Sequence, residues 1–324
     1  MRVAHVFANE SFESRGIKLI NSSKKSRITV VPYLKKKGES YLGFLIKTAD
    51  SILRENIETI HAHRISGFLP AILVKMLRPK TRIIYDKHDI HKYDFIFDRL
   101  LFFADHVIVC SELHLKQIRK MKKESSIIQN YSDFAPVSRK TAENVRKELK
   151  LGSKELFVLF QGSIVPSYGL DLLVKSLPKL DENARICIIG WIKDKDYWDS
   201  LKRDFSGKIR YIGSRKYEEM NKYVGSADAG VVLFDKSRLT TFGNPAKLFE
   251  FIACRIPVIC TDVQSVSPVI KKYGNGIVVN GESELADAIN KMADRKTREA
   301  YAKKSPNLSW DSEFKKYLKI LNKK

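Results

Sequence analysis

Residues 243–262 read Gly-Asn-Pro-Ala-Lys-Leu-Phe-Glu-Phe-Ile-Ala-Cys-Arg-Ile-Pro-Val-Ile-Cys-Thr-Asp, the pattern of a loop, a helix, a tight turn and a buried strand. Asn244 can cap the first turn with its side-chain oxygen, and Pro245 suits the first helical position because that position needs no amide hydrogen. The apolar strand after Pro257 places Asp262 at its carboxyl end, where open α/β sheets bind ligands. The stretch therefore predicts an α/β fold with a binding site beside this helix.

Two charged side chains on the predicted helix are candidates for that site. Lys247 and Glu250 lie three residues apart and so share one face of the helix. The positive end of the helix dipole together with Lys247 suits a phosphate, and Glu250, one turn further on, can accept hydrogen bonds from sugar hydroxyls. The alternative is a solvated ion pair, which contributes only about 0.2–0.5 kcal/mol. The flanking loop and strand favour the binding site.

Short apolar segments alternate with helical patterns along the whole chain, which indicates parallel strands joined by right-handed crossovers. A polar, charged stretch at 132–153 divides the pattern. We therefore expect two doubly wound, Rossmann-like α/β domains, 1–150 and 151–307, that face a central cleft. The expected strands are 2–8, 28–32, 57–61, 82–85, 106–110, 127–129, 156–161, 185–189, 209–212, 229–234, 257–261 and 276–279. The expected helices are 41–54, 67–77, 95–103, 112–121, 142–149, 170–177, 195–205, 217–224, 246–253, 284–293 and an amphipathic last helix at 309–321.

Composition limits the class of protein. The 324 residues include 44% apolar residues, enough for sizeable cores, and no apolar run has the roughly 18 residues that a membrane span needs. The four cysteines lie apart among apolar neighbours, and the amino terminus does not resemble a signal peptide, so we expect a cytoplasmic protein with reduced thiols. The net charge of +22 fits nucleic acid, anionic lipid or a phosphorylated substrate equally well.

Other turns carry candidate residues. Gly162, which is followed by Ser163, lets a backbone approach a ligand closely, and the helix that begins near Gly169 can offer amides to a phosphate. His88 and Asp89 follow an apolar strand and are placed for chemistry at its carboxyl end. The alternative is that they only bond the loop backbone.

Histidines and aspartates also form patterns that resemble metal sites. His61 and His63 point to the same side of a strand, as a metal pair would, but no third ligand stands near them in the sequence, so we expect no zinc site. Asp194 and Asp196 precede a helical pattern, where capping and the helix dipole explain them without a metal.

The helix with Lys247 and Glu250 resembles the nucleotide-sugar signature of glycosyltransferase family 4. Three other places share the resemblance, which covers nearly the whole chain: the turn at Gly162, the step His88-Asp89, and the pair His61 and His63. It implies the GT-B architecture of two Rossmann-like domains, with the last helix, 308–324, packed back on the first domain. It also implies that Glu250 binds the ribose of the donor and Lys247 its diphosphate. Further roles follow from the resemblance for His88 with Asp89 at the transferred sugar, His63 on the acceptor side, and Gly162, Ser163, Gly243 and Asn244 at the donor.

The chain departs from the family pattern at three positions. Phe242 stands where many members have a second glutamate, although a subgroup with Pro-x-Lys-Leu-x-Glu looks like this chain. Ser163 and Tyr168 replace an arginine and a lysine that usually contact the donor. The loss of this basic pair puts more of the binding on Lys247 and backbone amides, with Arg215 or Arg238 as substitutes.

The resemblance implies a retaining, metal-independent glycosyltransferase without a cofactor. It would move a sugar from a UDP- or GDP-linked donor to a hydroxyl of a glycan or lipid-linked acceptor, in cell-surface polysaccharide or glycolipid synthesis. The basic run Lys35–Lys37 could bind an anionic membrane surface at the inner face of the cell membrane. The alternatives are a nucleotide-sugar 2-epimerase of the same fold and a basic nucleic-acid-binding protein. We expect no nucleic-acid partner, because the cations are scattered and no binding motif is present.

Overall fold

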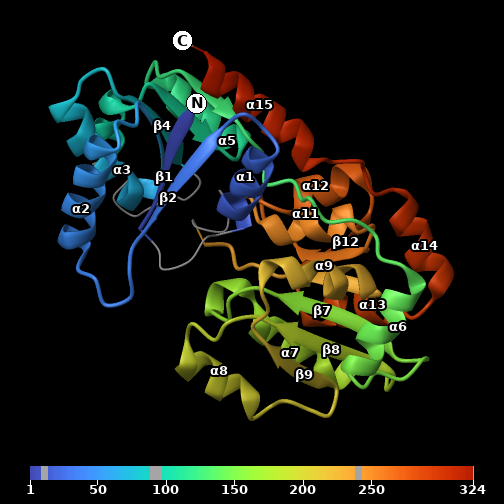
Figure 1. Cartoon of the computed structure of the whole chain (residues 1–324). Helices are drawn as coiled ribbons and strands as arrows, with labels where there is room; N and C mark the ends of the chain where they lie inside the picture. The colour runs from blue at the N-terminus through green and yellow to red at the C-terminus, as the bar shows by residue number, and fades with distance from the viewer. Residues whose placement is uncertain (9–13, 88–96, 238–242, 324) are drawn as a thin grey trace. The chain divides into compact units, whose positions relative to one another are not determined.

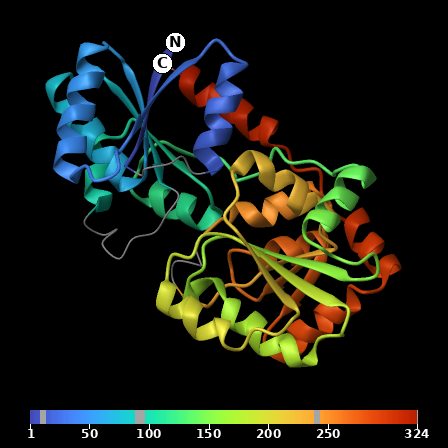
Figure 2. The same cartoon turned by 60° about the horizontal axis from the view of Figure 1, so that its bottom comes forward.

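The computed structural model describes residues 1–8, 14–87, 97–237 and 243–323 (Figure 1). The chain forms two compact units. The first contains residues 1–130, the short segment with Gly243 and Asn244, and the carboxyl-terminal helix, and the second contains the rest of the chain from Tyr131 to Ser309. Each unit has one six-stranded parallel sheet between helices, as Figures 1 and 2 show. The predicted α/β class with two Rossmann-like domains is confirmed.

The sheet of the first unit has the strand order β2-β1-β3-β4-β5-β6. Residues of α2, α3, η1 and α5 share one apolar core with one face of the sheet, and α1 and α15 contribute to the core on the other face. The strands are β1 (Arg2–Phe7), β2 (Thr29–Leu34), β3 (Thr59–His63), β4 (Arg82–Lys87), β5 (His106–Val109) and β6 (Ser125–Ile127), and the helices are α1 (Ser14–Lys24), α2 (Tyr41–Arg54), α3 (Arg64–Leu77), η1 (Asp98–Phe103), α5 (Glu112–Lys120) and α15 (Trp310–Asn322).

The sheet of the second unit has the order β12-β11-β10-β7-β8-β9. One core contains residues of α6, α9, α11 and α12, and the other contains residues of α7, α8 and α13. The strands are β7 (Leu156–Gln161), β8 (Ala184–Ile189), β9 (Ile209–Gly213), β10 (Ala229–Val232), β11 (Val258–Thr261) and β12 (Gly276–Val279). The helices are α6 (Arg139–Glu148), η2 (Pro166–Tyr168), α7 (Leu170–Ser176), η3 (Leu177–Lys179), α8 (Lys195–Lys202), α9 (Tyr217–Ser226), α11 (Ala246–Ala253), α12 (Ser267–Tyr273), α13 (Glu282–Lys291) and α14 (Arg295–Lys303).

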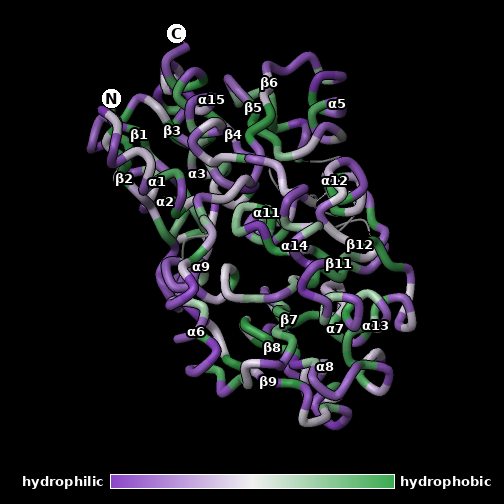
Figure 3. The backbone as a smooth tube through the Cα atoms, turned by 90° about the vertical axis from the view of Figure 1, so that its right-hand side faces the viewer, coloured by the Kyte–Doolittle hydropathy of each residue, from purple (hydrophilic) through white to green (hydrophobic). Residues whose placement is uncertain are grey.

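Central strands are apolar because helices cover both faces of a parallel sheet. Every residue of β7 is buried, and the strand reads Leu-Phe-Val-Leu-Phe-Gln. Figure 3 shows hydrophobic residues along such strands and hydrophilic residues on outer helices such as α6. Within the described ranges, no helix combines the length and the apolar character needed to cross a membrane.

The sequence placed some boundaries differently. Residues 131–150 were expected in the first domain, but they belong to the second unit because Val145 and Leu149 lie in its core. Helices α1, α12 and α14 were not predicted. Helix α1 buries Arg15 and Lys18, and α14 buries no residue, so neither shows an apolar stripe. The described part of the helix expected at 95–103 is the 3₁₀ helix η1.

The carboxyl-terminal helix α15 packs on the first unit. Trp310 is 2% exposed and donates a hydrogen bond from Nε1 to the Ser22 hydroxyl at 2.9 Å. The Lys18 ammonium lies 4.6 Å from the centre of its ring. At the other end of the helix, Arg82 donates to the carbonyl oxygens of Ile320 and Leu321, at 2.6 and 2.8 Å. These bonds fix the last turn of the helix to the end of the sheet.

We expect Trp310→Ala to lower the free energy of unfolding by about 3–5 kcal/mol, because the substitution leaves a cavity between α15 and the sheet. Chemical unfolding followed by circular dichroism measures the loss. Trp191→Ala is the matched control, because Trp191 is 64% exposed and its removal should change the stability by no more than about 0.5 kcal/mol. Equal losses in the two variants would contradict this account of α15.

Candidate functional site

The strand order of the second unit marks a place for a ligand. Strands β7, β8 and β9 follow one another to one side, and β10, β11 and β12 follow to the other, so the order reverses between β7 and β10. Open α/β sheets bind ligands beyond the carboxyl ends of the strands at such a switch point. Gly162 and Ser163 follow β7 here, and the chain after β10 leads to α11, which carries Lys247 and Glu250.

The amine of Lys247 is buried at this switch point. The side chain is half-buried as a whole, but its Nζ atom is inaccessible, and no hydrogen-bond acceptor in the described part of the chain reaches it. Nζ lies 4.2 Å from the centre of the Tyr168 ring, 5.1 Å from that of Phe234 and 5.4 Å from that of Phe160. Burial lowers the pKa of Lys247 to about 7, and the charge of Glu250 opposes this shift. An anion bound at this point would supply the missing partner.

Gly162 brings backbone against the same amine. Its φ is +124°, a conformation that residues with a side chain rarely adopt. A Cβ at this position would lie 2.9 Å from Lys247 Nζ, and a Cβ at Gly190 would lie 1.8 Å from the carbonyl oxygen of Gly162. The turn after β7 therefore lies between Lys247 and the segment after β8. Backbone leaves no room for a side chain at Gly190, and the φ of Gly162 disfavours one there.

Glu250 lies one turn after Lys247 and is 7% exposed. Burial, and then the charge of Glu250, raise the pKa of the Tyr217 hydroxyl. The same two causes raise the pKa of the Cys254 thiol to about 12. The carboxylate thus faces a mostly buried region where α11 meets the start of α9.

The predicted cap of α11 is wrong. Pro245 occupies the capping position, and the helix has no side-chain cap. The Asn244 amide instead donates to the carbonyl oxygen of Cys110 and to the side chain of Gln129, and Asn130 donates to the Asn244 carbonyl at 2.6 Å. Gly243 and Asn244 therefore pack with the first unit, because the bonds from the Asn244 side-chain nitrogen direct that side chain to Cys110 and Gln129 and not to the helix.

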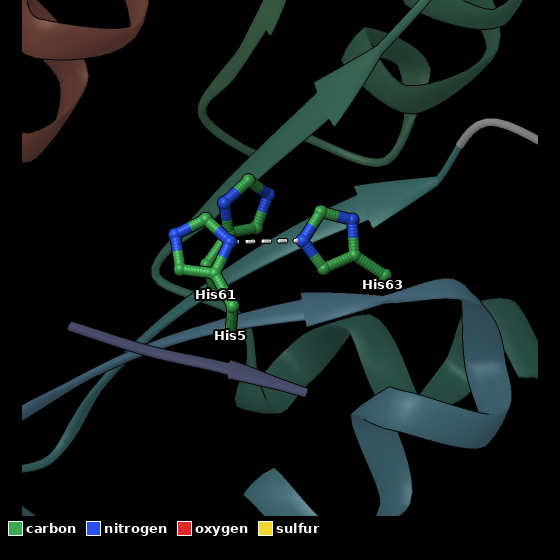
Figure 4. Close-up of side chains that lie close together, drawn as sticks. All are labelled: His5, His61 and His63. Carbon is green, nitrogen blue, oxygen red and sulfur yellow. Dashed lines mark hydrogen bonds between the residues drawn. The ribbon is translucent and has the colours of Figure 1, made fainter. Parts of the chain in front are cut away.

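A histidine cluster lies at the switch point of the first sheet, where the order reverses between β1 and β3. His5 stands directly opposite His61 on the neighbouring strand, and His63 follows two residues later on the same side. Figure 4 shows the three rings together, with a hydrogen bond of 3.2 Å between His5 Nδ1 and His63 Nε2. All three side chains are buried. The sequence analysis missed His5, because only the register of β1 and β3 brings it to the pair.

Hydrogen bonds connect the cluster to α15 and β4. The Tyr317 hydroxyl lies 2.9 Å from His61 Nδ1 and 3.1 Å from His5 Nε2. Asp86 lies 3.4 Å from His61 Nε2 and forms a buried ion pair of 2.7 Å with Arg15. Burial, followed by the neighbouring His61, lowers the pKa of His5 well below its usual value. His5 is therefore neutral at physiological pH.

The cluster has the composition of a metal site but not its ring orientation. One ligand atom from each of the three histidines can be chosen so that all lie within 4.8 Å of one another. However, the His61 and His63 rings are stacked, with centres 4.2 Å apart and planes 27° apart. Imidazole lone pairs lie in the ring plane, so stacked rings must turn before they can share one ion. The observed arrangement suits a hydrogen-bonded network.

Other candidates from the sequence have different outcomes. His88 and Asp89 lie outside the described residues. The Asp194 carboxylate accepts a hydrogen bond of 3.0 Å from the Tyr197 amide, which confirms it as a helix cap. Two residues that the sequence analysis missed, Gln161 and Trp191, lie at the carboxyl ends of β7 and β8. The sequence carries no signal for either residue, because the exposure of Trp191 and the burial of Gln161 are known only from the fold.

Comparison with known proteins identifies the family. The model of the family "Glycosyl transferases group 1" matches residues 141–308, more than half of the chain. The chain belongs to this family.

Several relatives are similar to this chain over different lengths. An uncharacterised glycosyltransferase of Methanocaldococcus jannaschii, MJ1178, is 26% identical over 95% of this chain and 86% of its own length. The putative teichuronic acid biosynthesis glycosyltransferase TuaC of Bacillus subtilis is 26% identical over 47% of this chain and 36% of its own. The family and these relatives establish glycosyltransferase activity as the class of function.

Solved structures show the same fold. The crystal structure of Anabaena Alr3699/HepE in complex with UDP and glucose superposes with a TM-score of 0.80, at 14% identity, over 99% of both chains. WaaG, a glycosyltransferase involved in lipopolysaccharide biosynthesis, superposes with a TM-score of 0.71, at 12% identity, over the full length of both. At these identities the likeness concerns the fold, which is that of GT-B glycosyltransferases.

The lowered pKa of Lys247 predicts a pH-dependent stability difference between the wild type and Lys247→Met. Between the folded pKa of about 7 and the unfolded value of 10.5, the unfolded chain binds more protons, so wild-type stability rises with pH. Below pH 7 the wild type carries the full cost of burying the charge, and the methionine variant should be the more stable protein. Unfolding free energies at pH 6, 8 and 10 measure the difference, which should shrink as pH rises. A difference that is constant with pH would contradict the burial of the amine.

Proposed function

We propose that this group 1 glycosyltransferase is a retaining enzyme of family 4 type, which transfers a sugar from a nucleoside diphosphate sugar to a hydroxyl of a glycan or lipid-linked acceptor. We propose further that it needs no metal ion and no cofactor. One observation carries the donor assignment: the Lys247 amine is buried at a switch point, among aromatic rings, without a hydrogen-bond acceptor in the described residues. Similar structures that hold UDP and UDP-glucose support a uridine nucleotide as the first donor to test.

The donor lies across the carboxyl ends of β7 and β10 in this proposal. Its diphosphate meets Lys247 and the backbone at Gly162 and Ser163, and the missing side chain of Gly162 allows close approach. Glu250 accepts hydrogen bonds from the ribose hydroxyls. Amides of Gly243 and Asn244 are proposed to contact the transferred sugar, since Phe242 replaces the usual second glutamate.

Tyr168 is proposed to compensate for the basic pair that the family resemblance leads one to expect. The ring stands where the family resemblance places a lysine, and its centre lies 4.2 Å from Lys247 Nζ. A cation over an aromatic face is stabilised without a negative charge, and so it remains available to an incoming anion. In this proposal the preorganised Lys247 binds the diphosphate in place of the missing arginine and lysine.

The chemical step follows from these positions. The bond between the anomeric carbon and the donor phosphate oxygen breaks, and the diphosphate leaves with the electron pair. The acceptor hydroxyl forms the new bond at the same face of the sugar, and its proton passes to an oxygen of the leaving diphosphate. Lys247 stabilises the charge that grows on the leaving oxygen. His88 with Asp89 is proposed to contact the transferred sugar.

The acceptor is assigned to the first unit. His63 ends β3 at the switch point of that sheet, and we propose that it shapes the acceptor side together with the histidines beneath it. An acceptor carried on a lipid would bring the enzyme to an anionic membrane surface at the cytoplasmic side. The basic run Lys35–Lys37 precedes α2, where Leu42 and Ile46 are 65% and 55% exposed. Cations beside exposed apolar side chains suit such a surface.

Glu250→Ala should weaken UDP binding at least about tenfold, because the ribose hydroxyls lose a charged acceptor. Isothermal titration with UDP, and with GDP in parallel, measures the loss. Glu250→Gln is the matched control and should lose less, since one acceptor oxygen remains.

Deoxyribose analogues separate a direct contact from a structural effect of the same substitution. The wild type should discriminate against 2′-deoxy- or 3′-deoxy-UDP, and Glu250→Ala should bind UDP and the deoxy analogue equally well. If the variant keeps the full discrimination, Glu250 does not read the ribose.

Metal independence has its own test. Enzyme treated with EDTA and then passed through a desalting column should keep its transferase activity, and added Mg²⁺, Mn²⁺ or Zn²⁺ should not raise it. The anomeric proton coupling of the product, measured by NMR, should show retention. Activity that disappears with EDTA and returns with Zn²⁺ would replace this proposal by a metal-dependent enzyme, with His5, His61 and His63 as its first candidate ligands.

A further inference from the structure

A single exposed tryptophan stands at the donor side of the second unit. Trp191 is 64% exposed, whereas Trp198 and Trp310 are 7% and 2% exposed. It follows β8 by two residues and so lies at the carboxyl edge of the sheet. An indole left in water at a ligand-binding edge loses the burial that large aromatic side chains usually gain.

The backbone that carries Trp191 is fixed. The Ile164 amide donates to the Trp191 carbonyl at 2.8 Å, and Ile164 and Ile192 form a parallel bridge beyond the ends of β7 and β8. The Gly190 carbonyl accepts a hydrogen bond of 2.9 Å from the Tyr211 hydroxyl. The exposure of Trp191 is therefore a property of an ordered strand end.

Strand alternation places Trp191 on the face of the sheet that carries α11. Cys187 and Ile189 pack in the core with α9 and α11, and Ile188 packs in the opposite core. Ile192 packs in that opposite core too, so the two-residue alternation continues past the end of β8. Trp191 thus shares the face of Ile189 and of the helix with Lys247 and Glu250.

A second residue on this face points to a ligand. Gln161 ends β7, pairs in register with Ile189 and is 4% exposed. Its Nε2 atom is buried and finds no acceptor in the portion of the chain that is described. A buried amide without a partner is costly, and a polar ligand beside it would remove that cost.

Trp191 is also connected to the proposed phosphate site at Lys247 through the turn at Gly162. A Cβ at Gly190, the neighbour of Trp191, would lie 1.8 Å from the Gly162 carbonyl oxygen. One at Gly162 would lie 2.9 Å from the Lys247 amine, so Gly190 and Lys247 both lie against the Gly162 turn. A nucleoside diphosphate that rests its diphosphate on Lys247 carries its base one ribose away. We propose that the Trp191 indole stacks on the nucleobase of the donor and that Gln161 offers its amide to the same nucleoside. The inference rests on the proposed donor function and adds the residue that contacts the base.

Binding measurements with Trp191→Ala and Trp191→Phe test the proposal. Loss of a stacked base typically weakens binding roughly 10- to 100-fold, so we expect Trp191→Ala to raise the Kd for UDP by that factor. Trp191→Phe keeps a ring and should lose less. Inorganic pyrophosphate, which has no base, should bind all three proteins equally. Circular dichroism melting should show unchanged folding, as expected for an exposed side chain.

Fluorescence gives an independent readout. Because Trp198 and Trp310 are buried, UDP should quench the emission of Trp191 in the wild type and should leave the emission of Trp191→Phe unchanged. Quenching that persists in Trp191→Phe would overturn the proposal. Equal weakening of UDP and pyrophosphate by Trp191→Ala would overturn it too, because the substitution would then act on the loop.

The failure of this inference is distinguishable from failure of the proposed function. If the wild type and Trp191→Ala bind UDP or GDP with the same Kd, the donor function stands and the stacking role is wrong. If Trp191→Ala changes only the KM of the acceptor, the indole contacts the acceptor and the assignment to the base is overturned. If the wild type binds no nucleoside diphosphate, the donor function fails and this inference fails with it.

Discussion

The second unit is organised around a buried ammonium. Lys247 reaches from the first turn of α11 to the end of β7, where three aromatic rings surround its Nζ atom. This placement favours glycine at 162, because the backbone there has a φ of +124° and a Cβ would lie 2.9 Å from the amine. It also sets the pKa of about 7, because burial disfavours the charged form. The ring positions, the tight turn and the strand order are thus parts of one arrangement that buries an amine away from every hydrogen-bond acceptor of the described residues.

The first unit instead buries a hydrogen-bonded network of histidines at its switch point. Three buried histidines on β1 and β3 and a tyrosine from α15 satisfy one another, while Asp86 is neutralised by Arg15. Buried polar groups are stable only when they are paired. The cluster therefore depends on α15, because the Tyr317 hydroxyl is the group that bridges His5 and His61. The histidine network at one switch point and the buried Lys247 at the other suit different ligands, which we propose to be the acceptor and the nucleotide donor.

The sequence was most informative where neighbouring residues alone determine the local structure. Residues 246–253 show the helix, its charged face and the following strand, and the structure has that helix with the same bounds. The cap at Asn244 failed because a partner distant in sequence, Gln129, competes for its amide. His5 was missed for the same reason, since its pairing with His61 depends on strand register. Gln161 and Trp191 became visible only once burial was known.

The first unit is built mainly from two distant parts of the sequence, residues 1–130 and the helix at 310–322. Residues 310–322 cover the sheet face formed by Val3, Ile84 and Ile108, while the whole second unit is encoded in between. On the ribosome, that face stays uncovered until residues 310–322 have been translated and have emerged. Domains generally fold in order as they are made. The second unit can therefore complete its folding first. The first unit is completed only when α15 packs on it, and until then its apolar sheet face is accessible to chaperones.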